Sequence, residues 1–350
     1  METKIEKVNP DRIDEEIIEE AGRLIAEGEL VAFPTETVYG LGGDALRPEA
    51  SRKIYAAKGR PSDNPLIVHI ADFSDMERVA AKVPAQAKKL AEAFWPGPLT
   101  MIVPKGDAVP YETTGGMDTV AVRMPGHPVA LELIRKSGCL IAAPSANTSG
   151  RPSPTEAKHV AEDLSGRIAM ILDGGPVGIG IESTIIDLTE KTPMVLRPGY
   201  ITPGMLAEVL GEDVIMDPGI IAADDTRKPK APGMKYKHYA PKAQMVIVEG
   251  QEDAVIAKIN ALSAQKRAEG RKVVIIATEE SKAYYEADRV MSIGSRTDED
   301  AIAQHLYKLL RECDEVQADE IYSESFQTPR IGQAIMNRLL KAAGHTVVQV

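Results

Sequence analysis

Residues 58–70 read KGRPSDNPLIVHI, and this stretch organises the first half of the chain. Lys58 and Arg60 are two cations one residue apart, held between a glycine and two prolines. Proline fixes the backbone φ angle, and the apolar run 66–70 that follows is typical of a buried strand. The pattern therefore predicts a rigid anion-binding loop that leads into a strand.

The length and composition indicate a globular protein of two domains. A chain of 350 residues corresponds to about two domains at roughly 150 residues each. Its 43% hydrophobic and 27% charged residues are ordinary for such a protein. No apolar segment approaches the roughly 20 residues that cross a bilayer, so we expect a cytoplasmic protein without a membrane partner.

The charge and cysteine content exclude several classes of function. A formal net charge of -11 opposes sequence-blind binding to a phosphate backbone, and 4% aromatic residues leave few platforms for base stacking. Cys139 and Cys313 stand far apart in no metal-ligand spacing. Neither a zinc site nor a disulfide framework is therefore predicted.

The first 216 residues alternate between strand and helix patterns and are predicted to form one α/β domain. Helices are expected over 13–27, 48–57, 84–94, 129–136, 155–163 and 203–210, and strands over 30–33, 66–70, 99–103, 119–124, 140–143, 168–172, 184–188 and 195–199. The segment 35–43 carries three glycines and several hydroxyls. It is interpreted as a loop that brings backbone amides to a ligand, or as a solvated turn.

Residues 217–242 are rich in proline, glycine and basic side chains and are predicted to be a linker. Aromatic residues among its cations favour a segment that lies on another surface, and a passive tether is the alternative. Residues 243–350 then predict strands over 245–248, 272–276, 289–293 and 320–322, and helices over 252–268, 299–311 and 331–342. This order indicates a small, Rossmann-like, mainly parallel α/β domain with a lid or docking role.

Polar side chains stand at the ends of several predicted strands. Ser145 and Asn147 follow a short apolar strand, where α/β sheets place ligand contacts, although a Ser or Asx turn is the alternative. His69 and Arg123 close two other strands, although a lone histidine that closes an apolar strand is more often a core residue. Since Lys58 precedes the strand that His69 ends, a pocket using both must span the sheet or contain a folded-back loop.

Familiar catalytic motifs are missing from the sequence. It contains no GxSxG, no HExxH, no local Cys and His pair and no paired-carboxylate motif. A reaction driven by positioning and charge neutralisation fits these residues better than covalent catalysis. Phosphate chemistry at a nucleotide's α-phosphate is of that kind.

Six ordered motifs together resemble the L-threonylcarbamoyladenylate synthase family, the YrdC-like proteins. They are Phe33-Pro34-Thr35-Glu36-Thr37-Val38-Tyr39-Gly40-Leu41, Lys58-Gly59-Arg60, Asn64-Pro65-Leu66, Trp95-Pro96-Gly97-Pro98-Leu99-Thr100, Ala121-Val122-Arg123 and Pro144-Ser145-Ala146-Asn147. The block 231–241 and the α/β tail resemble the long, two-domain form of the family, and Tyr236 in that block implies that the linker 217–242 closes over the active site. The resemblance implies a YrdC-like twisted mixed sheet with helices, followed by the smaller C-terminal domain.

The resemblance also implies the reaction. L-threonine, bicarbonate and ATP, with Mg²⁺, would give threonylcarbamoyladenylate and pyrophosphate. Downstream threonylcarbamoyl-transferase machinery would then place the group on a tRNA adenosine, and direct binding of tRNA stays open. Among the acidic residues Glu36, Asp44, Asp63 and Glu182, the sequence does not choose a magnesium ligand.

The family's site residues carry over onto matching positions. The resemblance implies Lys58, Arg60, Ser145 and Asn147 as the catalytic set, Thr37, His69, Arg123 and Ser183 as the threonine site, and Lys58, Arg60, Asn64, Thr119, Ala143, Ser145, Ser153, Arg197 and Tyr236 as the ATP site. Two other functions remain open. A non-catalytic RNA-binding module would rest on the basic linker, and carbamoyl transfer for metalloenzyme maturation would require cysteine-rich zinc motifs that are missing here.

Overall fold

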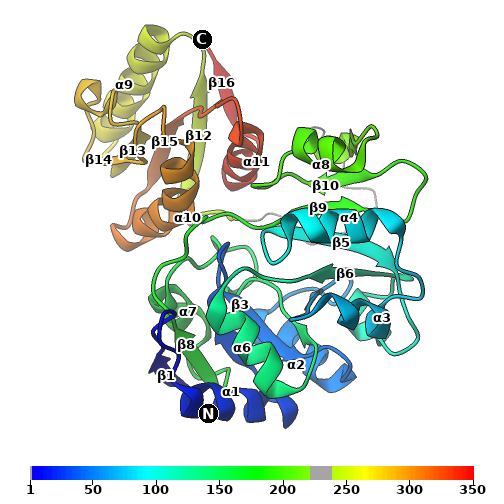
Figure 1. Ribbon diagram of the computed structural model, residues 1–350. Helices are drawn as coiled ribbons and strands as arrows, with labels where there is room; N and C mark the ends of the chain where they lie inside the picture. The colour runs from blue at the N-terminus through cyan, green and yellow to red at the C-terminus, as the bar shows by residue number, and fades with distance from the viewer. Residues whose placement is uncertain (1, 221–238) are drawn as a thin grey trace. The chain divides into compact units, whose positions relative to one another are not determined.

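The computed structural model describes residues 2–220 and 239–350 (Figure 1). The chain forms two compact units. Of the described residues, the first unit holds 2–149, 153–178 and 182–220, and the second holds 150–152, 179–181 and 239–350. Within the described residues no helix is long and apolar enough to cross a membrane.

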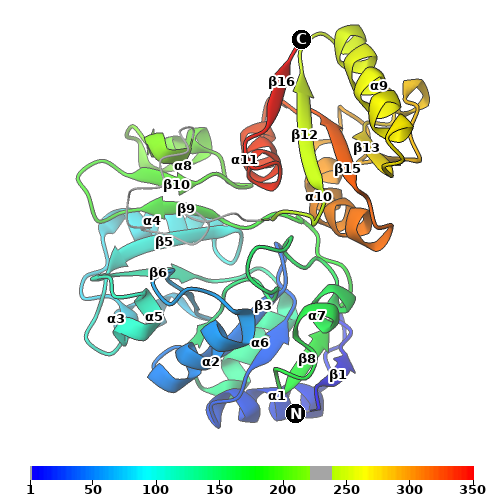
Figure 2. The same cartoon turned by 180° about the vertical axis from the view of Figure 1, so that it is seen from behind.

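The first unit is built on one mixed sheet, which confirms the expected fold class. Its strands are β1 (Lys4–Lys7), β2 (Val31–Phe33), β3 (Gly40–Asp44), β4 (Ile67–His69), β5 (Leu99–Pro104), β6 (Thr119–Arg123), β7 (Ile141–Ala142), β8 (Met170–Asp173), β9 (Thr184–Asp187), β10 (Met194–Arg197) and β11 (Ile215–Met216). They lie in the order β1-β8-β2-β3-β7-β4-β6-β5-β9-β10-β11. Figure 2 shows β6, β5 and β9 side by side in the middle of this unit.

Eight helices in the described part of the first unit cover this sheet. They are α1 (Glu15–Ala26), α2 (Pro48–Lys58), α3 (Met76–Val79), α4 (Ala85–Phe94), α5 (Tyr111–Thr114), α6 (Pro128–Ser137), α7 (Ala157–Leu164) and α8 (Pro203–Leu210). Asp14 caps α1 by accepting from the amide of Glu16, and Pro128 and Pro203 occupy the first turns of α6 and α8. The six longer helices confirm the predicted ones within a few residues.

Strand alternation sorts the core onto the two faces of the sheet. Ala32 and Val68 belong to a cluster shared with α2, α4, α7 and α8, whereas Val31, Phe33 and Ile141 belong to a cluster shared with α1 and α6. Successive side chains of a strand point to opposite faces, so these clusters mark opposite faces. On the face of α1 and α6, strands β4, β6, β5, β9 and β10 carry a smaller apolar cluster of their own.

Two interpretations of the sequence are wrong in part. The loop predicted over 35–43 ends at residue 39, and Gly40–Asp44 form the central strand β3 between β2 and β7. Its glycines let neighbouring side chains pack against the backbone. Lys58 lies in the last turn of α2 and not in a loop, because Gly59 ends that helix in the left-handed conformation at φ 62°. Strands β1 and β11 were not predicted.

The second unit is a five-stranded sheet in which every pairing is parallel. Its strands are β12 (Gln244–Glu249), β13 (Val273–Ala277), β14 (Arg289–Ser292), β15 (Glu320–Glu324) and β16 (Val347–Gln349), and its helices are α9 (Glu252–Ala268), α10 (Glu299–Glu315) and α11 (Gly332–Ala342). The order is β14-β13-β15-β12-β16. The parallel α/β prediction is confirmed, and β16 is an additional strand that the sequence reading missed.

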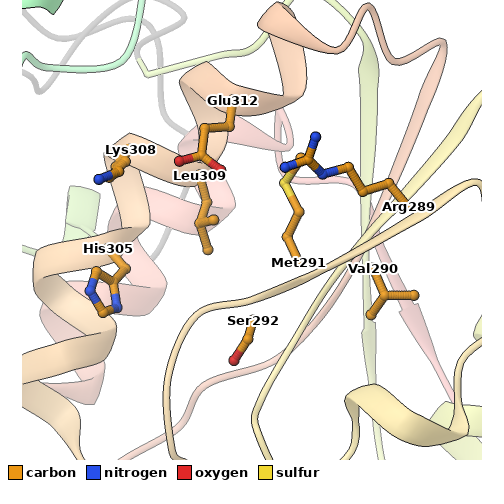
Figure 3. A pocket seen from close by; sticks show the side chains of 8 residues that line it. All are labelled: Arg289, Val290, Met291, Ser292, His305, Lys308, Leu309 and Glu312. Carbon is orange, nitrogen blue, oxygen red and sulfur yellow. The ribbon is translucent and has the colours of Figure 1, made fainter.

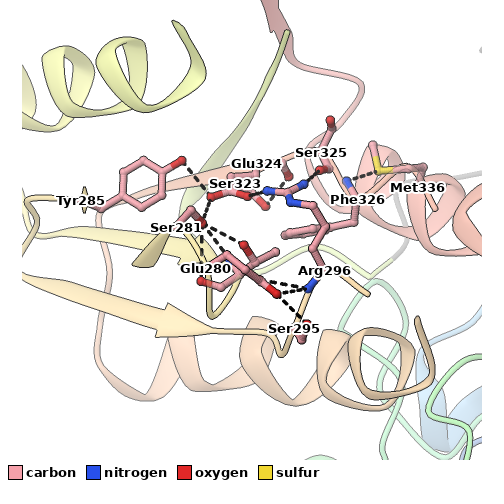
Figure 4. Close-up of polar contacts among 11 residues, drawn as sticks. Glu280, Ser281, Tyr285, Ser295, Arg296, Ser323, Glu324, Ser325, Phe326 and Met336 are labelled. Carbon is pink, nitrogen blue, oxygen red and sulfur yellow. Dashed lines mark hydrogen bonds and ion pairs between the residues drawn. The ribbon is translucent and has the colours of Figure 1, made fainter. Parts of the chain in front are cut away.

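An ion pair between a buried carboxylate and a half-exposed guanidinium joins the strand ends of the second sheet. Glu324, 3% exposed at the end of β15, accepts from the hydroxyls of Ser281 and Tyr285 and pairs with the guanidinium of Arg296 (Figure 4). The Arg296 amide in turn donates to Glu280 at 3.0 Å. Because these residues follow β13, β14 and β15, the network fastens three strand ends together. Both carboxylate oxygens of Glu324 are thereby satisfied.

Gly42 in β3 tests the close packing of the central strand. A Cβ there would lie 2.8 Å from both Ile141 Cγ2 and Phe33 Cε1. Gly42→Ala should therefore lower the free energy of unfolding by about 1–3 kcal/mol. The measurement is urea unfolding followed by the fluorescence of Trp95, the only tryptophan, which lies in this unit.

Gly178→Ala is the matched control, because a Cβ at Gly178 would meet nothing within 4 Å. Its midpoint should stay within error of the parent protein. Equal stability of both variants would show that β3 tolerates a methyl group and that its glycines serve another purpose.

Candidate functional site

One face of the first sheet brings the predicted site residues together along β6. Thr119, Ala121 and Arg123 alternate on the same face of that strand. Ala121 pairs with Ile67 and Arg123 pairs with His69 of β4. The apolar cluster of Ile67, Ile102, Ala121, Ile185 and Leu196 lies between the two ends. At about 3.3 Å per residue, Thr119 and Arg123 are about 13 Å apart.

Arg123 organises one end of this face. Its Nη1 donates to Thr37 Oγ1 at 2.9 Å and its Nη2 to Glu36 Oε1 at 2.6 Å, while Nε reaches the Gly97 carbonyl at 3.3 Å. The Arg123 side chain is only 5% exposed. Its charge is therefore compensated by a partly buried carboxylate, as a buried cation requires.

His69 lies beside Arg123 and is held neutral. Burial, followed by the charge of Arg123, lowers the pKa of His69 to about 3. Its Nδ1 lies 3.1 Å from the Ile67 carbonyl, and its ring meets Phe33 edge-on at 6.2 Å between centroids. A neutral imidazole at this place can bind a hydroxyl without competing with Arg123 for an anion.

Ser183 extends this end across β5. Thr100 of β5 pairs with Arg123 in the ladder, and its hydroxyl lies 2.8 Å from that of Ser183. Arg197 donates to both the hydroxyl and the carbonyl of Ser183, at 3.1 and 2.9 Å. Ser153 is fully buried and donates to Glu182, the neighbour of Ser183, at 2.6 Å. Ser153, Ser183 and Arg197 therefore share one polar cluster.

Lys58, Ser145 and Asn147 meet at the other end. The Lys58 ammonium, 3% exposed at the end of α2, donates to the carbonyls of Ser145 and Asn147. The Lys58 carbonyl accepts from the amide of Ser149 at 2.9 Å. The structure thus places a buried cation directly under the loop that follows β7, which is the arrangement an anion requires.

Arg60 and Asn64 lie where β4 begins. Arg60 donates to the carbonyls of Asn64 and Pro65 at 3.3 and 3.1 Å, so its guanidinium stays beside the start of the strand. Thr119 opens the adjacent β6, and the Ala143 amide donates to Ile67 at 2.8 Å. Asn64 is 1% exposed, and its Oδ1 has no hydrogen-bond partner among the described residues. A buried amide oxygen in this state can accept a ligand donor.

The segment from Thr35 to Tyr39 connects the two ends. Tyr39 accepts from the Ala146 amide at 2.8 Å and donates its own amide to Pro154 at 2.9 Å. Two residues earlier, at most about 7 Å away, Thr37 bonds Arg123. The sequence raised two alternatives, a pocket that spans the sheet and a folded-back loop, and both occur here. The site residues are spread along the strands, and the segment from Thr35 to Tyr39 folds back between the two ends.

Some site residues lie elsewhere or were not predicted. Tyr236 and most of the predicted linker are outside the described residues, so closure over the site stays a prediction. Thr100 was named only as part of a motif and not as a site residue. Its position opposite Arg123 would have indicated the site, but only if the pairing of these two strands had been known. Glu36 was considered only as a metal ligand, because no local pattern links it to Arg123, 87 positions away.

No group of three or more His, Cys, Asp or Glu side chains within 2–220 and 239–350 is placed to hold a metal ion. The second unit contains a cavity of about 370 Å³ between β14 and α10 (Figure 3). It is lined by Arg289, Val290, Met291, Ser292, His305, Lys308, Leu309 and Glu312. None of these residues belongs to the predicted site. The negative charge of Glu312 lies among the positive charges of Arg289 and Lys308 in this lining.

The mixed sheet, with two polar ends on one face, is typical of a YrdC-like α/β enzyme. A family model described as Telomere recombination matches residues 23–199, and one described as Threonylcarbamoyl-AMP synthase, C-terminal domain, matches residues 201–344. The chain belongs to the threonylcarbamoyl-AMP synthase family.

Several relatives match nearly the whole chain. Threonylcarbamoyl-AMP synthase of Bacillus subtilis is 52% identical over 333 residues, which cover 95% of this chain and 94% of the relative. That of Pyrococcus abyssi is 50% identical over 341 residues, covering 97% and 98%. A crystal structure of Pyrococcus abyssi Sua5 complexed with L-threonine has a TM-score of 0.94 and 49% identity and covers 99% of this chain and 100% of that one.

The neutral state of His69 predicts a pH dependence of stability. Unfolded His69 takes up a proton below about pH 6.5, whereas the folded protein does not until about pH 3. The free energy of unfolding is therefore highest above the pKa of unfolded His69 and decreases as the pH is lowered. From this residue alone, the decrease between about pH 7 and pH 5 is about 2 kcal/mol. His69→Gln should remove that contribution, as measured by urea unfolding of both proteins across this range.

A constant difference between the His69→Gln protein and its parent at every pH would contradict this assignment. It would mean that His69 binds protons equally in the folded and unfolded states.

Proposed function

We propose that this site condenses L-threonine, bicarbonate and ATP into threonylcarbamoyladenylate and pyrophosphate. The product supplies the threonylcarbamoyl group that modifies an adenosine of tRNA. The observation that carries this proposal is the placement of two chemically different ends on one face, about 13 Å apart along β6. One end offers the cations Lys58 and Arg60 to phosphates, and the other offers a guanidinium and hydroxyls to a small amino acid.

Threonine is assigned to the end around Arg123. The guanidinium suits the substrate carboxylate, and Thr37, His69 and Ser183 offer small polar groups around it. The neutral imidazole of His69 suits the threonine hydroxyl, because a second cation would compete for the carboxylate. The relative from Pyrococcus abyssi has L-threonine bound in its crystal structure, which supports this class of substrate.

ATP is assigned to the end around Lys58. Lys58 and Arg60, with Ser145 and Asn147, would contact the phosphates and the carbamate, and Asn64, Thr119, Ala143 and Tyr236 would complete the nucleotide site at this end. Ser153 and Arg197, which the family resemblance also assigns to ATP, lie in the polar cluster around Ser183, so ATP would have to reach that cluster as well. Lys58 is suited to a phosphate because two carbonyls fix its ammonium at the loop after β7. Tyr236 would act from the segment 217–242, between a catalytic domain of residues 1–216 and a second domain of residues 243–350.

The chemistry needs positioning and charge neutralisation more than a covalent nucleophile. The threonine amine captures the one-carbon unit, and the carbamate oxygen attacks the α-phosphorus while the bond to pyrophosphate breaks. Lys58 and Arg60 would hold the phosphates and stabilise the leaving charge. Mg²⁺ bound to ATP would add Lewis-acid stabilisation. Few carboxylates are needed, because magnesium is held largely by phosphates and water.

Omission of single substrates tests the proposed reaction. Release of pyrophosphate from ATP should require both L-threonine and bicarbonate, since the carbamate is the nucleophile. A coupled pyrophosphate assay with each substrate withheld in turn measures this. Pyrophosphate release that is unchanged when either L-threonine or bicarbonate is withheld would contradict the synthase function and favour simple hydrolysis of ATP.

Lys58→Ala tests the cation at the phosphate end. Loss of a desolvated ammonium aimed at the transferring phosphate should lower kcat/KM for ATP at least roughly 100-fold. Circular dichroism should still report a folded protein. Lys53→Ala is the matched control, because Lys53 lies on the same helix and pairs at the surface with Glu29. Undiminished turnover of Lys58→Ala would remove Lys58 from the catalytic set.

A further inference from the structure

Glu36 carries a buried oxygen whose partner is missing from the described protein. Its Oε1 pairs with Arg123 Nη2 at 2.6 Å. Its Oε2 is buried from solvent and has no hydrogen-bond donor among residues 2–220 and 239–350. A carboxylate oxygen without a donor costs free energy and is rare in folded proteins, so its position indicates a ligand that donates to it.

Arg123 retains matching donors. A guanidinium has five N–H groups, and three of those in Arg123 point at Gly97, Thr37 and Glu36, so five minus three leaves two. The pair thus offers two N–H donors from its positive member and one oxygen from its negative member. This combination complements a zwitterion, which brings a carboxylate for the guanidinium and an ammonium for the carboxylate.

We propose that Glu36 binds the α-ammonium of L-threonine and accepts the proton that the amine loses when it is carbamoylated. This proposal rests on the proposed function and adds a residue to its mechanism. A neutral zwitterion on a neutral ion pair leaves no net charge in the buried site, which keeps the desolvation cost low. Arg123 thereby selects the carboxylate, and Glu36 selects an amino acid over a hydroxy acid.

The proton transfer balances with the reaction. The ammonium gives one proton to Glu36 Oε2, and the freed nitrogen lone pair forms the N–C bond to bicarbonate. A C–O bond of bicarbonate breaks, and its oxygen leaves as water with a second proton from the nitrogen. Ammonium, bicarbonate and ionised Glu36 thus become a carbamate, water and protonated Glu36, with no other reactant.

The surroundings of Glu36 argue against a magnesium ion at this oxygen. The guanidinium of Arg123 already touches the carboxylate, and it would repel a divalent cation placed on the second oxygen. Among the described residues, the other titratable group on which the charge of Glu36 is shown to act is His127, which follows Gly126 in the chain. Burial lowers the pKa of His127, whereas the charge of Glu36 opposes that shift. An ammonium donates three hydrogen bonds without demanding further carboxylates.

A binding experiment on the full chain separates ammonium contact from support of Arg123. Glu36→Gln keeps an oxygen for Arg123 and replaces the other with an amide group that repels an ammonium. By calorimetry without ATP, the variant should bind L-threonine roughly 10- to 100-fold more weakly. It should bind 3-hydroxybutyrate, which is threonine without its amino group, within about two-fold of the parent protein.

Glu112→Gln is the matched control, since Glu112 pairs with Arg52 at the surface and should leave both affinities unchanged. Equal losses for both ligands would show that Glu36 only supports Arg123 and would overturn the proposal. An unchanged affinity for threonine would overturn it as well. Failure of the parent protein to bind threonine would instead contradict the proposed function itself.

The pH dependence of turnover tests whether Glu36 accepts the proton. This measurement can be made even where 3-hydroxybutyrate binds too weakly for its affinity to be measured. Without the carboxylate, the reaction depends on threonine that is already deprotonated. The deficit of Glu36→Gln should therefore shrink by several-fold or more between about pH 7 and about pH 9 at saturating threonine. A deficit that stays constant over this range would mean that Glu36 accepts no proton.

Discussion

The buried guanidinium of Arg123 is the constraint on which the site depends. A cation that is 5% exposed must be compensated locally, and Glu36, Thr37 and the Gly97 carbonyl do so. These contacts fix the segment between β2 and β3 over the face of the sheet. That segment continues to Tyr39, whose backbone bonds Ala146 and Pro154. Compensation of one charge therefore also positions the loop beside Lys58.

The pleat of the sheet sets the distance between the two ends. Thr119 and Arg123 share a face because they are four residues apart on β6, and the parallel pairing of β4 brings His69 beside Arg123. The apolar side chains between them form a floor without polar groups that could compete for a ligand. A shift of the register by one residue would turn both ends to the opposite face, so sheet packing and site geometry are specified together.

Much of the fold follows from local pattern, whereas the contacts of the site do not. Hydrophobic periodicity predicts α1, α4 and the parallel second sheet, because the spacing of apolar residues within each element determines which of its faces is buried. Gly59 was a C-cap signal that would have placed Lys58 on a helix. Strand β3 has little intrinsic strand propensity and forms because its glycines fit between Phe33 and Ile141. The Glu36 and Arg123 pair depends on strand register, which no local window contains.

The charge of Arg123 also determines what His69 can do. A protonated imidazole beside the guanidinium would place two cations in one buried site, and the lowered pKa of His69 records how unfavourable that is. A neutral His69 adds no second positive charge directly beside Arg123. In the proposed complex, the carboxylate of threonine would meet Arg123, its hydroxyl would meet the imidazole, and its ammonium would meet Glu36. Three neighbouring side chains of different charge would thus separate three groups of one small molecule.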